Sequence, residues 1–314
     1  MKNNFWQDKK IIVTGGGGFL GQCVVSELFR HGALQKDIFI PRSKEYDLRE
    51  KAVAEEVVRG RDIIIHLAAT AGGILFNKEN PATIFYDNAA MALHLIDAAF
   101  KAGVKKFVGI GSGCEYPKFT AVPFQESDLW AGYPEETNAA YAFAKKFMLV
   151  ESQAYREQYG FNAINLILAN MYGPRDDFDL KSSHVIPALI QKIITAKESK
   201  DNFIEFWGTG KPQREFLYVD DAARAVVAAA EKYNEADPIN IGSGKEISIK
   251  DLVLILCRLL NYHGEVHWDA SKPDGQPRRL LDVTNAKDKL GFLAQTDLET
   301  GLRKTIDWYQ TSKA

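Results

Sequence analysis

The stretch IIVTGGGGFLG, residues 11–21, decides the fold class of this 314-residue chain. It places a short β-branched run directly before a row of glycines, and an apolar helical pattern follows. Glycines make such a turn tight and let the backbone approach a pyrophosphate, which then rests on the N-terminus of the helix. The stretch therefore predicts a dinucleotide-binding loop, with an ordinary glycine-rich turn as the alternative. The residues expected to hold the cofactor are Gly15, Gly18, Phe19, Leu20 and Gly21.

Beyond this loop, apolar runs and helical patterns alternate along the chain. Further strands are expected at 37–41, 62–67, 106–110 and 162–168, and helices at 22–31, 49–59, 88–103, 138–159 and 220–233. The strands are continuous apolar runs, which is typical of a parallel sheet covered by helices on both faces. The sequence thus predicts an α/β fold with a doubly wound parallel sheet of the Rossmann type.

After Gly173 and Pro174 the sequence becomes richer in loops, prolines and charges. We interpret residues 1–172 as a dinucleotide-binding Rossmann domain and residues 173–314 mainly as a smaller substrate-binding lobe. Residues 218–243 contain an alanine-rich helical pattern and are expected to return to the first domain.

Composition excludes several classes of protein. Lys and Arg number 39 against 41 Asp and Glu, so the net charge is −2, and 46% of the residues are hydrophobic. This balance excludes a disordered chain and argues against a nucleic acid or an anionic membrane as partner. No apolar run approaches the roughly 18 residues of a transmembrane helix, and the polar N-terminus is unlike a signal peptide. With three scattered cysteines, the expected compartment is the reducing cytoplasm.

Two cations follow the second expected strand, where the adenosine ribose of a dinucleotide lies. Arg42 and Lys44 suit the 2′-phosphate of NADP, whereas a carboxylate for the free 2′-hydroxyl of NAD does not come before Glu45. We therefore expect NADPH as the cofactor, with NAD as the alternative. A solvated loop is the competing interpretation of the two cations. Asp62, just before the third expected strand, is expected near the adenine.

The pattern Tyr141-x-x-x-Lys145 lies on the expected helix 138–159, where a spacing of four puts both side chains on one face. An ammonium beside a phenol favours the phenolate, so such a tyrosine can exchange a proton with a carbonyl or carbinol oxygen during hydride transfer. Ser112 closes the fourth expected strand at the carboxyl edge of the sheet, where ligands bind. Together with the glycine loop, these residues resemble the short-chain dehydrogenase/reductase superfamily of the extended type.

The second residue after Ser112 is Cys114. Dehydratases of the same superfamily carry an Asp–Glu pair after the corresponding hydroxyl residue, but here those positions are Gly113 and Cys114. Elimination of water would therefore lack its acid and base, whereas a thiol beside cations can serve as a base. A small buried hydrophobe is the alternative role of this cysteine.

Longer strings extend the resemblance through nearly the whole chain. They are GSGCEYP at 111–117, NMYGP at 170–174, SHVIPAL at 183–189, WGTGKPQREFLYVDD at 207–221 and SKPDGQPRRLLDV at 271–283. The set is similar to the GDP-L-fucose synthase family, whose members are 3,5-epimerases and 4-reductases of a GDP-4-keto-6-deoxy sugar. The resemblance implies such a sugar as substrate.

The resemblance also implies roles for single residues. Ser112, Tyr141 and Lys145 would form the reductase triad, and Cys114 and His184 would be the base and the acid of epimerisation. The residues implied in binding the sugar nucleotide are Asn170, His184, Lys192, Trp207, Arg214 and Arg279. Relatives that act on other GDP-linked sugars, including heptoses, share these motifs, so a GDP-sugar 4-reductase or epimerase is the alternative function. A non-catalytic nucleotide-binding protein should have lost the tyrosine or the lysine of the triad, and both are present.

The chain departs from the family pattern at three places. Gly17 stands where members often carry Arg, Ala68–Ala71 replaces a stretch with Lys-Val, and Glu115 replaces an apolar residue beside the cysteine. The pair His263 and His267 is not expected to bind a metal, since the sequence offers no further ligands. The expected helices at 88–103 and 138–159 could pair with their copies as a four-helix bundle, as in related enzymes, which predicts a homodimer.

Overall fold

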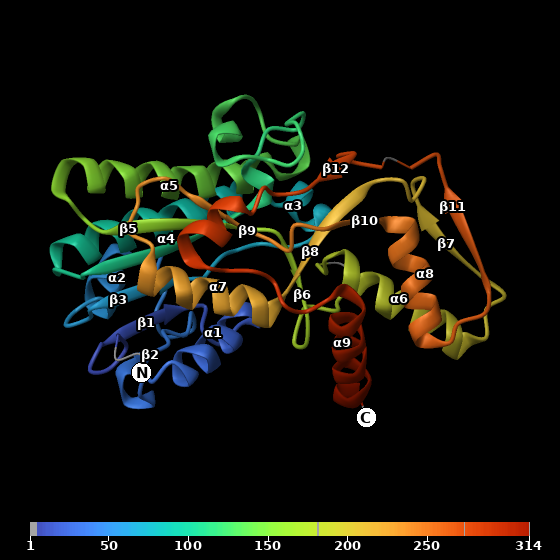
Figure 1. Ribbon diagram of the computed structural model, residues 1–314, viewed down its shortest axis with the longest axis horizontal. Helices are drawn as coiled ribbons and strands as arrows, with labels where there is room; N and C mark the ends of the chain where they lie inside the picture. The colour runs from blue at the N-terminus through green and yellow to red at the C-terminus, as the bar shows by residue number, and fades with distance from the viewer. Residues whose placement is uncertain (1–4, 181, 273, 314) are drawn as a thin grey trace.

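The computed structural model describes residues 5–180, 182–272 and 274–313. Its centre is a six-stranded parallel sheet with the order β2-β1-β3-β4-β5-β9 (Figure 1). The chain runs from β1 outward to β2 and then crosses to β3 on the other side, so the topological switch lies beside β1. This confirms the predicted doubly wound α/β fold. The strands are β1 (Ile11–Thr14), β2 (Ile38–Phe39), β3 (Ile63–His66), β4 (Lys106–Ser112), β5 (Ala163–Leu168) and β9 (Ile239–Ile241).

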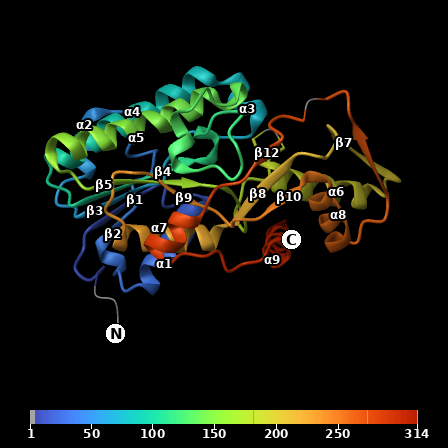
Figure 2. The same ribbon diagram turned by 45° about the horizontal axis from the view of Figure 1, so that its top comes forward.

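Helices cover both faces of this sheet, which explains why its strands are continuous apolar runs. Ile11 and Val13 point into a core with α1 (Phe19–Arg30) and α7 (Val219–Lys232). Ile12 points the other way, into a core shared with three helices that lie together on the opposite face (Figure 2). These helices are α2 (Lys51–Val57), α4 (Pro81–Lys101) and α5 (Ala139–Tyr159). The short α3 (Ile74–Glu79) leads into α4.

A second core lies beside the carboxyl edge of the large sheet. Its longest strand pairs antiparallel with β10 and parallel with β6 and β12, and two further strands form a separate parallel pair. The strands are β6 (Asn170–Tyr172), β7 (Phe203–Trp207), β8 (Gln213–Tyr218), β10 (Glu246–Ser248), β11 (Glu265–Asp269) and β12 (Arg278–Arg279). The helices of this lobe are α6 (Val185–Ser199), α8 (Ile249–Leu260) and α9 (Leu298–Lys313).

The chain crosses between the two cores more than once. After β8, α7 packs against α1 and β9 completes the large sheet. Residues beyond 280 also return, because Leu281, Leu290 and Phe292 belong to the core around α1 and α7. Each return ties the lobe to the core of the large sheet.

Two helices differ from the sequence prediction for reasons of local chemistry. The helix expected at 88–103 begins at Pro81, where a proline costs little because the first N–H of a helix has no partner in any case. Exposed Phe85 and Tyr86 hide the amphipathic pattern of these first turns. The sequence prediction includes no helix at 185–199. The structure forms α6 there, because a proline in the first turn of a helix, such as Pro187, removes no hydrogen bond. Among the described residues, no helix is both long enough and apolar enough to cross a membrane.

Candidate active site

The glycine loop has the geometry that close approach of a ligand requires. Gly15 has φ +68°, and a Cβ there would lie 2.8 Å from the backbone nitrogen of Ala68. A Cβ on Gly21 would lie 2.1 Å from the carbonyl oxygen of Gly15. Gly18 caps α1 without a side-chain hydrogen bond, so the first N–H groups of the helix, at Phe19 and beyond, face the loop. The loop therefore fits the pyrophosphate of a dinucleotide.

Gly17 makes room for a cation. A Cβ at this position would lie 1.5 Å from Nη1 of Arg42, so the guanidinium lies directly across the backbone of the loop. Arg42 and Lys44 are both exposed after β2. The cation that family members often carry at position 17 is thus replaced, in space, by one from the neighbouring segment.

The structure corrects the role expected for Asp62. Its carboxylate accepts a hydrogen bond from the backbone N–H of Lys10 at 2.8 Å, and its carbonyl oxygen accepts one from Lys105. These residues precede β1 and β4, so Asp62 lies at the amino edge of the parallel sheet. The glycine loop follows the carboxyl end of β1, and the prediction that Asp62 approaches the adenine is therefore wrong.

The segment that follows β3 closes the other side of the loop, and the sequence did not single out the residues that hold it. The amide of Asn88 donates to the carbonyl of Thr70 at 2.8 Å and accepts from the N–H of the same residue at 3.2 Å. Asp87 accepts the Thr70 hydroxyl at 3.0 Å. At the end of β3, burial lowers the pKa of His66 to about 3, and its Nδ1 lies 2.8 Å from the hydroxyl of Thr14.

Ser112, Tyr141 and Lys145 converge where α5 packs on the turn after β4. The Lys145 ammonium is 5.7 Å from the centre of the Tyr141 ring, and burial lowers its pKa to about 8. Burial, with smaller contributions from Cys114 and Glu115, raises the pKa of Tyr141 above its usual range. The sequence pattern favours a phenolate, but burial raises the pKa of the phenol instead. Tyr141 is thus held as a phenol, the form that donates a proton.

Cys114 is placed beside two arginines. Nη1 of Arg279 donates to its sulfur at 3.1 Å, and the rest of the guanidinium is held by the side-chain oxygen of Gln276. Arg279 on β12 is opposite Arg214 on β8, and burial together with Arg279 lowers the pKa of Arg214 to about 10. Negative charge on Cys114 acts in the opposite direction on Arg214. The Cys114 sulfur therefore lies in direct contact with a cation.

The other residues implied in binding the sugar nucleotide lie on β6 and β7 and on α6 or next to its start. His184 is exposed at the N-terminus of α6, where the surrounding protein lowers the pKa of its imidazole and Asp177 opposes this change. Lys192 donates to the carbonyl of Glu205, and Trp207 is exposed at the end of β7. Asn170 begins β6. Among the residues that the structure describes, no hydrogen bond or ion pair joins His184 to Cys114, although the Gly73 N–H donates to the Ser182 carbonyl at 2.7 Å and links that loop to the segment after β3.

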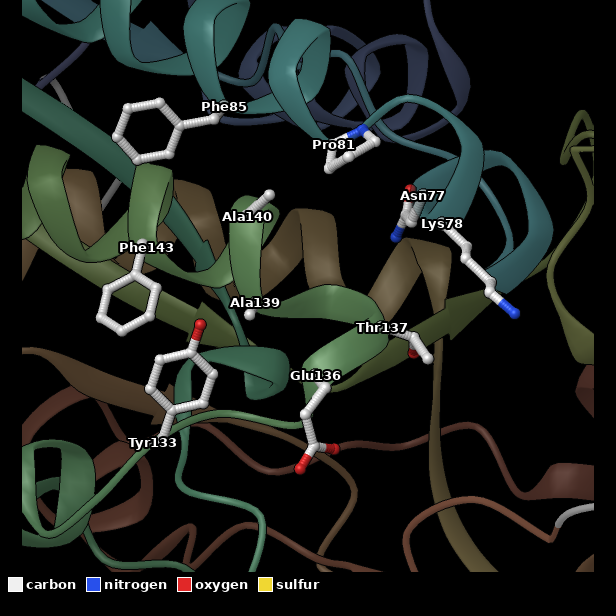
Figure 3. Close-up of a pocket in the computed structure, with 10 residues that line it drawn as sticks. All are labelled: Asn77, Lys78, Pro81, Phe85, Tyr133, Glu136, Thr137, Ala139, Ala140 and Phe143. Atoms are coloured by element: carbon white, nitrogen blue, oxygen red, sulfur yellow. The ribbon is translucent and has the colours of Figure 1, made fainter.

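A hollow of 440 Å³ opens on the outer side of α5 rather than at this site. Figure 3 shows Phe85 of α4 and Phe143 of α5 on the same side of the hollow, with the Tyr133 ring next to Phe143. Tyr141 does not line the hollow. The hollow is therefore separate from Tyr141, and its lining includes Phe85 of α4 and Phe143 of α5.

Known proteins resemble this chain throughout its length. The model of the NAD dependent epimerase/dehydratase family matches residues 11–242. A GDP-L-fucose synthase of Sinorhizobium fredii is 40% identical over 308 residues, which are 98% of this chain and 97% of that protein.

Solved structures agree with these sequence matches. A GDP-6-OMe-4-keto-L-xylo-heptose reductase from C. jejuni superposes with a TM-score of 0.90 at 26% identity, covering 97% of this chain and 98% of that one. A GDP-L-fucose synthetase from Naegleria fowleri bound to NADP gives a TM-score of 0.87 at 27% identity, covering 98% and 95%. The similarity therefore includes the lobe as well as the nucleotide-binding sheet.

Proposed function

We propose that this chain, which belongs to the NAD dependent epimerase/dehydratase family, is an NADPH-dependent 3,5-epimerase and 4-reductase of a GDP-4-keto-6-deoxy sugar. The observation that carries the proposal is the pair of residue sets at one sheet edge. Ser112, Tyr141 and Lys145 suit ketone reduction, and Cys114 beside Arg279 suits proton abstraction. The GDP-L-fucose synthase of Sinorhizobium fredii, alike over nearly the whole chain, supports the substrate class.

Reduction needs a proton donor beside the C4 oxygen. NADPH, when bound, supplies the hydride to C4. The phenol of Tyr141 then donates its proton to the C4 oxygen, and the Ser112 hydroxyl donates a hydrogen bond to the same atom. The Lys145 ammonium stabilises the phenolate that forms when Tyr141 has given up its proton.

Epimerisation uses the ketone before it is reduced. The 4-ketone acidifies the hydrogens at C3 and C5, so one base and one acid can invert both centres in turn. Cys114 as thiolate removes each proton, with Arg279 stabilising its charge, and His184 returns a proton from the opposite face. Asn170, Lys192, Trp207 and Arg214 would hold the sugar nucleotide, with Arg214 suited to its diphosphate.

The choice of NADPH over NADH rests on Arg42. Its guanidinium lies across Gly17 at the mouth of the glycine loop, and Lys44 adds a second cation on the same segment. A charge-assisted hydrogen bond to the 2′-phosphate contributes about 1.5–3 kcal/mol, which corresponds to roughly ten- to a hundredfold discrimination.

The exposed face of α4 and α5 favours a homodimer. The two helices lie side by side, and both leave large apolar side chains in solvent at helical spacing. These are Phe85, Tyr86 and Leu93 on α4 and Phe143, Phe147 and Val150 on α5. Pairing with the same face of a second copy would bury them in a four-helix bundle.

Incubation with GDP-4-keto-6-deoxymannose in D₂O separates the two half-reactions. Wild type should consume NADPH and incorporate deuterium at C3 and C5, with NMR identifying the product. Tyr141→Phe should lose NADPH consumption by about 10²-fold or more while still exchanging both hydrogens. Cys114→Ser and His184→Asn should lose exchange while ketone reduction continues.

The same assay tests the second candidate function. The structural likeness to a heptose reductase favours a 4-reductase for another GDP-linked sugar. That function predicts NADPH consumption with a GDP-4-keto-heptose and no deuterium at C3 or C5. Exchange of the C3 and C5 hydrogens by Cys114→Ser at the wild-type rate would contradict the assignment of Cys114 as the base.

A further inference from the structure

Glu115 is a buried carboxyl directly behind the proposed base, and the mechanism above does not use it. Its side chain is only 1% exposed at the end of the short turn Gly113–Glu115. Oε1 accepts a hydrogen bond from the backbone N–H of Ser112 at 2.6 Å, while the Ser112 hydroxyl accepts one from the N–H of Cys114 at 3.3 Å. These two bonds close the turn that carries Ser112 and Cys114.

The end of β4 leaves space for this carboxyl. A Cβ on Gly111 would lie 2.3 Å from Oε1 of Glu115, so a side chain there would force the carboxyl out. Burying a carboxylate is costly unless hydrogen bonds and opposite charges compensate. Burial raises the pKa of Glu115 to about 7, and the Ser112 N–H, Lys145 and Lys146 act in the opposite direction. The carboxyl therefore changes its charge near neutral pH.

Two lysines of α5 respond to this charge. Lys145 and Lys146 are both buried, and burial lowers the pKa of each ammonium while Glu115 opposes the change. The Lys146 ammonium is held by the carbonyl of Leu129 at 2.5 Å, so its position is fixed by the loop before α5. On Tyr141, burial raises the pKa and the charge of Glu115 adds to the rise.

We propose that Glu115 is a positioning residue of the reductase, which sets the turn carrying Ser112 and Cys114 and places a buried carboxyl against α5, the helix of Tyr141 and Lys145. This inference rests on the proposed function, because a protonated Tyr141 is needed only where a ketone is reduced. The carboxyl acts through other residues and does not itself need to touch the sugar.

The variant Glu115→Gln separates the charge from the hydrogen bond. Its amide oxygen can still accept the Ser112 N–H, but no negative charge remains. Removing that charge lowers the pKa of both Lys145 and Tyr141, so the pH above which NADPH consumption falls should move down by about one unit. Because the Glu115 carboxyl is protonated below about pH 7, wild type and variant should agree at pH 6 and diverge above pH 8.

A measurement without substrate keeps this test independent of the proposed function. In protein labelled with ¹³Cε-lysine, the Lys145 resonance is assigned as the one lost in Lys145→Arg. Its titration midpoint, expected near pH 8 in wild type, should fall by about one unit in Glu115→Gln. In wild type the same resonance should also show a step near pH 7, as Glu115 ionises, and this measurement does not depend on the folding of Glu115→Gln.

Glu215→Gln is the matched control. Glu215 is also 1% exposed and also accepts backbone N–H groups, from Gly244 at 2.7 Å and Leu281 at 2.9 Å. It lies in the lobe and should leave the Lys145 midpoint unchanged. An unchanged midpoint in Glu115→Gln, together with a single wild-type step, would overturn the proposal. If the Lys145 midpoint shifts in Glu115→Gln but the wild-type protein consumes no NADPH with any GDP-4-keto sugar, the proposed function is wrong and the role of Glu115 stands.

Discussion

At the scale of single residues, the contact between Arg279 and Cys114 changes how the site is understood. The family resemblance implies that this arginine binds the sugar nucleotide, but its Nη1 donates to the thiol sulfur at 3.1 Å. Gln276 accepts from two other nitrogens of the same guanidinium and fixes its plane. Arg279 is therefore positioned to assist the proposed base, and its neighbour across the strands, Arg214, is the one proposed for the diphosphate.

Arg279→Gln should slow alkylation of Cys114 by iodoacetamide about tenfold at pH 7, because the thiolate loses its adjacent cation. Mass spectrometry of the Cys114 peptide gives the rate without any substrate. Cys23 should not interfere, since burial and Asp220 raise the pKa of its thiol to about 12.

The neighbouring arginine provides the control for this prediction. Arg278 precedes Arg279 on β12 but is exposed and paired with Glu246. Arg278→Gln removes the same charge and should leave the alkylation rate at the wild-type value. Equal slowing in both variants would mean that the total positive charge of the lobe, rather than the contact between Arg279 and the sulfur, acts on Cys114.

At the scale of elements, the glycine loop and the segment after β2 form one unit. Gly17→Ala adds a single methyl group, which would lie 1.5 Å from Nη1 of Arg42 and must displace that flexible side chain. We expect about a tenfold loss of affinity for adenosine 2′,5′-bisphosphate and no change for 5′-AMP. Calorimetric titration measures both without turnover.

A double variant tests whether the glycine acts through the arginine. In an Arg42→Ala background, Gly17→Ala should cause no further loss of affinity for the bisphosphate. Weaker binding of 5′-AMP as well would show that the methyl group disturbs the loop itself. Additive losses of bisphosphate affinity in the double variant would show that Gly17 and Arg42 act independently.

Elements with a local signal could be predicted from the sequence. The glycine loop, the apolar strands and the spacing of Tyr141 and Lys145 are short-range patterns, and the structure places each of them as expected. The prediction for Asp62 is wrong for a general reason. A residue that precedes a parallel strand lies at the amino edge of the sheet, whereas the cofactor loop lies at the carboxyl edge. The contacts Gly17–Arg42 and Cys114–Arg279 depend on tertiary packing, and no local pattern reports it.

At the scale of the whole molecule, the exposed apolar face of α4 and α5 should control assembly. Val150, on α5, is 49% exposed, and Val150→Glu would place a charge in the paired face at a desolvation cost. We expect a dimer for wild type and a monomer for the variant by light scattering. Leu254→Glu, at a 51% exposed apolar position on α8, should remain dimeric. A wild-type monomer, or equal behaviour of both variants, would exclude this face as the interface.

The division of the site between two cores has a consequence for how such an enzyme can diversify. Ser112, Tyr141 and Lys145 are attached to the large sheet and its helix, whereas Arg279 and Arg214 arrive on strands of the lobe. The residues proposed for hydride chemistry and those proposed for sugar binding therefore belong to different cores of the molecule. Substitutions confined to the lobe can therefore change which sugar is bound, while Ser112, Tyr141 and Lys145 on the large sheet and its helix stay the same.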